Sequence, residues 1–297
     1  MPRSTMELSY PVDLTTTLAP LRRGPSDPTH RIGKAQVSRA TNTPVGPATI
    51  HLSQSGRLIE AEAWGPGADW ALEHLDELMG GKDQEAVIPR HPIVERLVWT
   101  LRGVRMTRTL SVFEALFPAI LEQKVTSREA HASFSRIVSR YGEPAPGPFD
   151  LMLQPTPEVL AELPYFDYHP LGVERKRAET IRLAASRVAR LECTSDEDER
   201  TLGPKLLSLL GIGPWTAAEV TRLAFGDSDS VSVGDFHLPH LVSWALAGEP
   251  RGDDRRMLEL LEPYAGQRAK VVRLLEVGGP RPPAFGPRMP VRSFRSL

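Results

Sequence analysis

The sequence predicts a mainly α-helical protein with an α+β unit at its N-terminus, and three observations lead to this fold class. Apolar residues alternate in two short runs around Ser55 and Gly56, a pattern typical of a β-hairpin. Beyond about residue 110, apolar residues recur at helical spacing in one segment after another. The chain has 297 residues, of which 40% are hydrophobic and 25% charged, enough for two or three compact units of an ordinary globular protein.

The N-terminal α+β unit is expected to span residues 1–85. Its hairpin lies in "ATIHLSQSGRLIEAEAW", with Ser55-Gly56 at the turn. The segment "ADWALEHLDELMGG", residues 68–81, repeats apolar residues one helical turn apart before a glycine stop, which indicates an amphipathic helix. The polar segment "GGKDQEAVIPRHP" then indicates a linker, so we place a domain boundary near residue 85.

The second unit, residues 86–277, is expected to be helical throughout. Ser111 with Glu114, and Thr126 with Glu129, have the spacing of capping boxes at helix starts. Pro118 falls inside the first of these helices and should bend it. Further helices are expected after Thr156-Pro157 and at 178–188, 205–210, 214–225, 240–248 and 255–264. Residues 278–297 form a basic tail rich in proline and arginine, for which we expect little packing.

Several classes of protein are disfavoured by composition. The chain has one cysteine, Cys193, so it can form neither a disulfide framework nor a four-cysteine iron–sulfur site. It has no run of 18 apolar residues, and its first residues have no apolar signal segment. The cytoplasm is therefore the expected compartment.

The net charge of −1 conceals an uneven distribution. Basic residues gather in 88–106, 174–190 and 268–297, whereas acidic residues gather in 60–85 and 196–199. This asymmetry is compatible with a basic, nucleic-acid-binding face on a nearly neutral protein. Charge alone does not separate that possibility from a set of solvated helix faces.

The stretch "LLGIGPWTAAEV", residues 209–220, interrupts a leucine-rich helical region with a Gly-Ile-Gly hairpin. Gly211 and Gly213 allow positive φ and close backbone approach, and Pro214 suits the first turn of the next helix. The free N–H groups and the dipole at that helix start favour an anion such as a phosphate. A plain turn between two helices remains an alternative. Asp235 follows Gly234 at the expected start of a later helix, where aspartate is also a common cap.

Four segments together resemble one family of DNA repair enzymes. They are "LLGIGPWTA" (209–217), "VGDFHL" (233–238), "FEALFPAILEQKVTS" (113–127) and "LGVERKRAETI" (171–181). The chain resembles the 3-methyladenine DNA glycosylase II (AlkA-like) group of the helix-hairpin-helix (HhH-GPD) superfamily. The resemblance implies two helical subdomains around a cleft, and it extends more weakly to the N-terminal unit.

The resemblance assigns roles in DNA binding to residues of two segments. It implies a phosphate contact at the hairpin, through Gly211, Ile212, Gly213 and Thr216. Carbonyl groups of Leu207, Leu209 and Ile212 match positions where the family often binds Na⁺ or K⁺; no other cofactor is expected. Gln123 and Lys124 match the residues that fill the gap left by a flipped nucleotide. Because Lys124 is hydrophilic, a phosphate contact suits it equally well.

The resemblance also implies the chemistry, with Asp235 as the catalytic carboxylate. Family members that cleave the strand carry a lysine where this chain has Trp215. An indole cannot form an imine, so AP-lyase activity should be absent. Trp215 is expected to stack on the flipped base, although a core role remains an alternative. Phe236 and Glu219 are the other candidates for the base pocket.

Several alternatives stay open from the sequence. Asp227 and Asp229 are rival carboxylates, although turn roles suit them better. His237 and His240 form a weak metal-ligand pair without an obvious third ligand. The expected function is excision of alkylated purines from double-stranded DNA by a monomer associated with the nucleoid. A damaged-DNA binding protein with altered catalysis, or a glycosylase for deaminated or oxidised bases, would carry many of the same residues.

Overall fold

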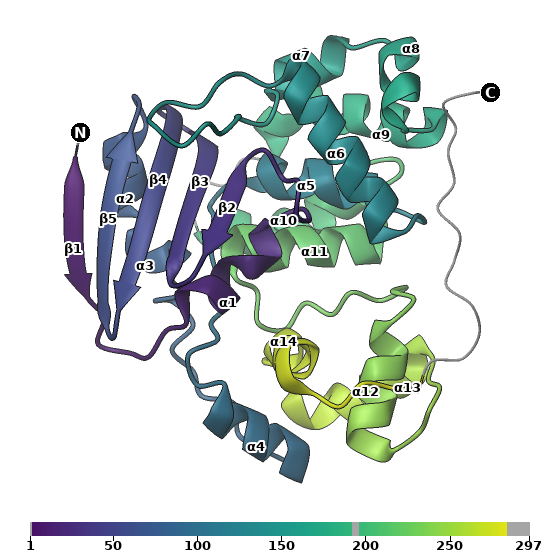
Figure 1. Ribbon diagram of the computed structural model, residues 1–297. Coiled ribbons are helices and arrows are strands. Elements are labelled where there is room, and N and C mark those ends of the chain that lie inside the picture. Colours follow the sequence, from purple (N-terminus) through teal and green to yellow (C-terminus); the bar gives the residue numbers. More distant parts are fainter. Residues whose placement is uncertain (1, 192–195, 284–297) are drawn as a thin grey trace.

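The computed structural model describes residues 2–191 and 196–283, and Cys193 and most of the Pro/Arg-rich tail lie outside these residues. The described chain is mainly helical with an N-terminal sheet, which confirms the predicted fold class. Figure 1 shows the sheet standing to one side of the helices. Its five strands are antiparallel in the order β1-β5-β4-β3-β2. They are β1 (Arg3–Glu7), β2 (His30–Gly33), β3 (Gln36–Thr43), β4 (Gly46–Ser55) and β5 (Leu58–Trp64).

The β4–β5 hairpin is the one that the sequence predicts. Ser55 pairs with Leu58, and Gly56 in the loop has a φ of 63°, a left-handed conformation that glycine adopts without a steric cost. Ile59, Ala61 and Ala63 alternate as buried residues along β5, facing the core.

The helix predicted over residues 68–81 is divided into α2 (Ala68–Glu73) and α3 (Leu75–Leu78). The break is at His74, whose ring nitrogen bonds the Trp70 carbonyl at 2.8 Å, in addition to the backbone N–H. The ring also stacks on the Trp70 indole. The contacts between His74 and Trp70 therefore occur where the helix is interrupted. The spacing of apolar residues does not predict this interruption.

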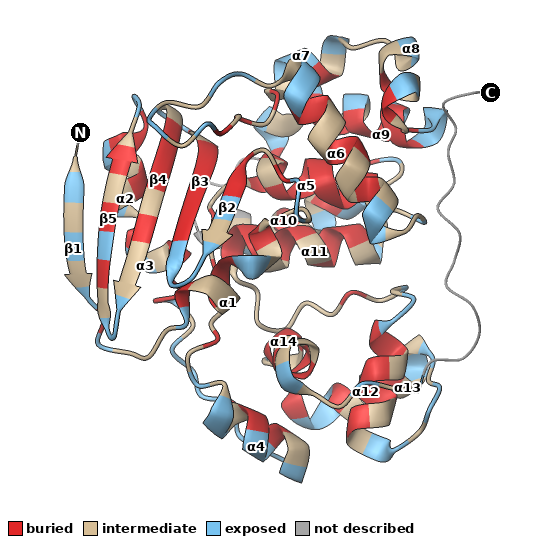
Figure 2. Ribbon diagram, in the orientation of Figure 1, coloured by how far each residue is buried: buried red, intermediate tan, exposed pale blue. Residues whose placement is uncertain are grey.

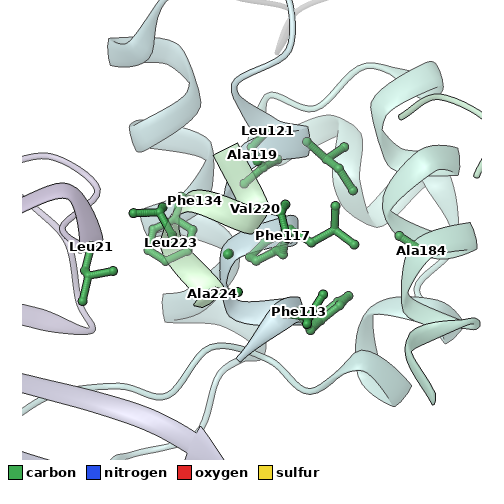
Figure 3. Close-up of a cluster of buried hydrophobic side chains, with 14 of the residues drawn as sticks. Leu21, Phe113, Phe117, Ala119, Leu121, Phe134, Ala184, Val220, Leu223 and Ala224 are labelled. Atoms are coloured by element: carbon green, nitrogen blue, oxygen red, sulfur yellow. The ribbon is translucent and has the colours of Figure 1, made fainter. Parts of the chain in front are cut away.

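The largest of three hydrophobic clusters in the described residues joins the sheet to the helices beside it (Figures 1 and 2). Figure 3 shows Phe113, Phe117 and Phe134 packed among Val220, Leu223 and neighbouring residues at its centre. The helices of this lobe are α1 (Leu14–Leu18), α5 (Val112–Leu121), α6 (Ser127–Tyr141), α7 (Pro157–Glu162), α8 (Tyr165–Tyr168), α9 (Arg175–Ala185), α10 (Asp196–Leu207) and α11 (Pro214–Phe225).

A second core lies below the first in Figure 1 and belongs to a smaller lobe. Its helices are α4 (Pro92–Thr100), α12 (Leu238–Ala247), α13 (Asp254–Leu261) and α14 (Arg268–Gly278). α4 comes from the middle of the chain but packs against α14 near the C-terminal end. The predicted domain of residues 86–277 therefore contributes to both cores, because residues 112–225 lie with the sheet.

Two of the three predicted helix starts have the expected caps. Thr126 and Glu129 form a complete capping box, and the Thr156 hydroxyl accepts the N–H of Val159. The capping box predicted at Ser111 is wrong, because its side chain makes no cap bond. The Glu114 carboxylate instead accepts hydrogen bonds from the Thr41 hydroxyl, the Asn42 N–H and the Arg39 guanidinium of β3.

The predicted helix over 205–210 also differs from the structure. α10 spans Asp196–Leu207, so it starts within the acidic run and ends before the hairpin. Pro118 lies inside α5, and the helix continues to Leu121. Because proline donates no hydrogen bond, the Glu114 carbonyl lacks its usual partner, and the Gln154 amide donates to it at 3.4 Å.

A buried histidine in the sheet gives a prediction about pH. His30 in β2 is 4% exposed, and burial lowers its pKa to about 3, with Arg39 and Arg23 acting in the same direction and Asp27 opposing them. The folded protein therefore holds fewer protons than the unfolded chain, where a histidine pKa is about 6.5. We expect the free energy of unfolding to fall as the pH drops below about 6.5, by about 2 kcal/mol at pH 5.

Urea unfolding midpoints at pH 7, 6 and 5 would measure this loss. A His30→Gln variant should show a smaller decline between pH 7 and 5 than the native chain. His51, whose pKa is also lowered by burial, is the matched comparison, since its ring is more accessible and its replacement should remove less of the decline. An identical decline in the His30→Gln protein would show that other groups carry the pH dependence.

Candidate active site and DNA interface

Trp215 and Asp235, which the sequence singles out separately, meet where the two lobes join. Trp215 lies in the first turn of α11, half-buried against the larger core. Its indole Nε1 donates a hydrogen bond to Asp235 Oδ2 at 3.0 Å. Asp235 Oδ1 accepts the backbone N–H groups of His237 and Leu238 at 2.7 and 2.9 Å, at the start of α12. Three hydrogen-bond donors at the start of α12 and on the Trp215 ring thus hold this carboxylate in place.

Asp235 and Trp215 also have structural roles that the sequence left open, a helix cap and core packing. Asp235 caps the first turn of α12 through its Oδ1 atom, and Trp215 packs at the edge of the core. Its side chain nevertheless reaches the carboxylate through the one polar atom of the indole ring. A residue that served packing alone would not require an aspartate opposite its nitrogen.

The two glycines of the hairpin have different reasons to be glycine. Gly211 has a φ of 91°, and a Cβ at this position would stand 2.4 Å from Thr180 Oγ1 of α9. Gly213 has a φ of −107°, which other residues adopt easily, and a Cβ there would meet nothing within 4 Å. Positive φ is therefore used at Gly211 and not at Gly213, whose outer side is open.

The start of α11 presents N–H groups without an intrahelical acceptor. The first bond of this helix runs from the Ala217 N–H to the Gly213 carbonyl at 3.0 Å. The N–H groups of Trp215 and Thr216 therefore precede the regular bonding of the helix, and Pro214 has none. The anion contact that the sequence predicts at the hairpin would use these N–H groups.

Gln123 and Lys124 follow the end of α5 and adjoin the hairpin. The Gln123 amide nitrogen donates to the Gly211 carbonyl at 3.0 Å and to Thr216 Oγ1 at 2.9 Å. The Gln123 side chain therefore links the Gly211 carbonyl of the hairpin to Thr216 in the first turn of α11. Lys124 is exposed and has a φ of 56°, in the left-handed region.

The carbonyl groups considered for a monovalent cation lie along the turn between α10 and α11. Leu207 is the last residue of α10, and the Leu209 carbonyl accepts the Ile212 N–H at 3.1 Å. A carbonyl oxygen with one hydrogen bond keeps a second lone pair. The donor set is therefore of the oxygen type that alkali cations accept.

Glu219 lies one helical turn after Trp215 and is already paired on both oxygens. Ser232 Oγ donates to Oε1 at 2.5 Å, and Arg222 Nη2 donates to Oε2 at 2.6 Å. Burial would lower the pKa of Arg222, but Glu219 and Glu276 outweigh it and raise the pKa above its ordinary value. On the face of α11 next to Trp215, these side chains therefore form a charged hydrogen-bond network and not an aromatic surface.

Glu122 extends the same network from the end of α5. Burial would raise its pKa, but Arg23, His131 and Arg222 together hold the pKa of the carboxyl below its ordinary value. Nothing in the sequence around Glu122 pointed to this role. Arg222 could have been found from the sequence, because helical spacing puts it on the same face of α11 as Trp215 and Glu219. Ser232 and Thr180 could not, since only tertiary packing brings them to this site.

The rival aspartates have other partners. Asp227 Oδ1 accepts the Asp229 N–H at 2.9 Å within a turn. Asp229 accepts the Gly266 N–H at 2.8 Å and pairs with Arg268, which outweighs burial and lowers the pKa of the carboxyl. Of the three aspartates in this segment, Asp235 is the one bonded to Trp215.

The aromatic and histidine side chains that follow Asp235 lie on the surface. Phe236 is 78% exposed, and its ring meets His237 and His240 edge-on, with centroids 5.0 and 6.1 Å apart. Within residues 2–191 and 196–283, no group of three or more His, Cys, Asp or Glu side chains has the arrangement of a metal site. In the same part of the chain, no helix is long and apolar enough to cross a membrane.

Comparison with known proteins gives relatives over part of the chain. No model of a known protein family matches it. The probable bifunctional transcriptional activator/DNA repair enzyme AlkA of Mycobacterium tuberculosis is 29% identical over 163 residues, 52% of this chain and 32% of the relative. YfjP of Bacillus subtilis, named for an expected DNA-3-methyladenine glycosylase activity, is 28% identical over 172 residues, 54% of this chain and 58% of the relative. The chain thus spans about a third to somewhat over half of these relatives.

Solved structures share the fold over nearly the whole chain. The 3-methyladenine DNA glycosylase of Archaeoglobus fulgidus has a TM-score of 0.73 at 20% identity, covering 93% of this chain and 98% of its own. The 8-oxoguanine glycosylase/lyase of Clostridium acetobutylicum has a TM-score of 0.69 at 13% identity, covering 93% and 96%. The chain thus has the fold of the helix-hairpin-helix DNA glycosylases, and over about half of its length it is similar in sequence to AlkA and YfjP.

Proposed function

We propose that this protein is a monofunctional DNA glycosylase that removes alkylated purines, of the 3-methyladenine and 7-methylguanine type, from double-stranded DNA. The observation that carries the proposal is the hydrogen bond between Trp215 and Asp235 beside a hairpin with free N–H groups. The relatives named for DNA repair and for 3-methyladenine excision support the choice of substrate.

The reaction begins with rotation of the damaged nucleotide out of the duplex. This step costs a few kcal/mol, less when the base is damaged. The hairpin amides hold a phosphate near the lesion, and the sugar of the flipped nucleotide then faces Asp235. The carboxylate stabilises the positive charge that develops on the sugar as the glycosidic bond breaks, and it orients or deprotonates the attacking water.

The fixed position of Asp235 suits this role. Its two oxygens are held by Trp215 on one side and by the start of α12 on the other, so little reorganisation is needed during the reaction. Alkylation at N3 or N7 makes the purine cationic and a good leaving group, so a general acid is not required. The faces of Trp215 and Phe236 are suited to stack on such a cation.

The absence of lyase activity follows from the residue after the hairpin. Trp215 stands where strand-cleaving members of the superfamily carry a lysine, and indole nitrogen is not a nucleophile toward the sugar carbon. The fold does not separate the two activities, since a glycosylase/lyase shares it. The proposal therefore depends on Trp215, together with hydrolysis at Asp235.

The proposal includes a structural cation and a monomeric state in the cytoplasm. The carbonyl groups of Leu207, Leu209 and Ile212 would hold Na⁺ or K⁺ on the turn before α11. Such a cation would add positive charge beside the phosphate contact. It takes no part in bond cleavage.

Incubation of the native protein with methylated duplex DNA tests the function. We expect release of 3-methyladenine, with strand breaks appearing only after alkali treatment. Breaks before alkali would show lyase activity and contradict the monofunctional mechanism. DNA binding without release of any base would favour a damaged-DNA binding protein, and release of only deaminated or oxidised bases from matched duplexes would favour another lesion.

A further inference from the structure

Lysine is rare in this chain, and two of its exposed lysines flank the glycine hairpin. The sequence has 36 basic residues, of which six are lysines. Lys124 follows α5 and Lys176 lies in the first turn of α9, so they come from distant parts of the sequence. Both are exposed, whereas Lys270 is largely buried and paired with Asp83.

Lys176 is tied to the hairpin through one intervening residue. Its carbonyl accepts the Thr180 hydroxyl at 2.9 Å, one turn further along α9. The Thr180 side chain stands directly against Gly211, where a Cβ would approach its Oγ1 to 2.4 Å. The first turn of α9 therefore lies beside the hairpin.

Lys124 is tied to the hairpin from another element. The preceding residue, Gln123, donates to the Gly211 carbonyl and to Thr216 Oγ1. The left-handed conformation of Lys124 is one that a lysine rarely adopts, and it directs the chain from α5 toward α6. Both lysines thus lie within one residue or one helical turn of a group that contacts the hairpin.

Neither lysine is neutralised by a carboxylate in the described part of the chain. The two residues beside Lys176 are paired, Arg175 with Glu179 at 3.9 Å and Arg177 with Glu174 at 3.6 Å. Among the residues that the structure describes, no ion pair involves Lys124 or Lys176. An exposed ammonium group that keeps its charge is suited to bind a phosphate and release the counterions around it.

We propose that Lys124 and Lys176 bind DNA phosphates on either side of the one held by the hairpin amides. The backbone of one DNA strand then runs across the hairpin, from the end of α5 to the start of α9. This inference rests on the proposed function, because it needs DNA at the hairpin. It assigns Lys176 to the DNA interface and gives Lys124 a phosphate contact in place of the gap-filling role.

The test is the salt dependence of affinity for a duplex with a stable abasic-site analogue. The native protein is compared with Lys124→Gln, Lys176→Gln and the double variant. Each single substitution should weaken binding about 5- to 10-fold near 0.1 M salt and reduce the slope of log K against log salt by about 0.9. The double variant should lose about twice that slope. Lys34→Gln, in the exposed turn between β2 and β3, is the control and should match the native protein (Figure 1).

The outcomes separate this inference from the proposed function. A native slope in Lys176→Gln, with salt-sensitive binding by the native protein, would overturn the role of Lys176 alone. Weaker binding of Lys124→Gln to the abasic duplex with a native slope would instead show that Lys124 fills the gap. Binding by the native protein that does not respond to salt would contradict DNA binding at the hairpin itself. Thermal melting of each variant checks that the fold is intact.

Discussion

Replacement of Asp235 by asparagine is expected to reduce the rate of base release from methylated DNA by about 100- to 1,000-fold, the usual effect of removing one strong electrostatic group from a transition state. The asparagine oxygen can still cap α12, so the local fold should persist. The negative charge opposite the sugar is lost, however, and an amide nitrogen in place of Oδ2 would face the indole N–H as a second donor. Single-turnover release of 3-methyladenine measures the effect.

Asp227→Asn is the matched control for this experiment. Asp227 is a nearby aspartate on the same loop, and its carboxylate accepts a backbone N–H within a turn. This variant should release the base at close to the native rate. Both variants should bind a duplex with an abasic-site analogue within a few-fold of the native affinity. Native release by Asp235→Asn would assign the chemistry to another carboxylate.

Alanine at Gly211 and at Gly213 should produce different kinds of damage. Gly211→Ala forces a left-handed alanine, which costs about 1–2 kcal/mol, and drives its methyl group against Thr180. The melting temperature should fall, and DNA affinity should fall with it because the hairpin is displaced. Gly213→Ala meets no neighbour and keeps an allowed backbone, so its stability should stay near native. Its methyl group would nevertheless stand where a phosphate approaches the amides, and DNA affinity should drop at least about tenfold, the equivalent of one charge-assisted hydrogen bond.

Melting curves and DNA binding measured on both variants make this comparison. Thr180→Ala combined with Gly211→Ala should recover part of the lost stability, because the steric conflict is removed while the left-handed conformation remains. Full DNA affinity in Gly213→Ala would show that the phosphate lies elsewhere. Equal loss of stability in both alanine variants would mean that the space around Gly213 is filled in solution.

Local patterns in the sequence predicted much of the fold. The β4–β5 hairpin and the capping box at Thr126 depend on residues close together in the chain, so composition and spacing are enough. The capping box at Ser111 failed because Glu114 has stronger partners on β3, more than 70 positions away. α14 lies in the segment expected to be helical, but the sequence did not predict its bounds, and it packs against the distant helix α4.

The site shows the same division between local and tertiary information. Spacing and family resemblance identified Trp215, Asp235 and the hairpin, but neither predicted that the indole would hold the carboxylate. Glu219 was expected in a base pocket, and its partners Arg222 and Ser232 became visible only when α11 and the following loop were placed together. Whether it also contacts a base stays a prediction.

The separation of the two larger cores has a consequence for heat inactivation. The hairpin is anchored in the larger core, whereas Asp235 lies in the turn just before α12, a helix of the smaller core. The two sets of buried residues do not overlap. Cooperative units with fewer buried contacts open first on warming. The smaller lobe should therefore unfold at a lower temperature than the larger one. On heating, base release should be lost before DNA binding is lost. Under the proposed function, a molecule in that state would bind damaged sites without repairing them and would inhibit other repair enzymes there.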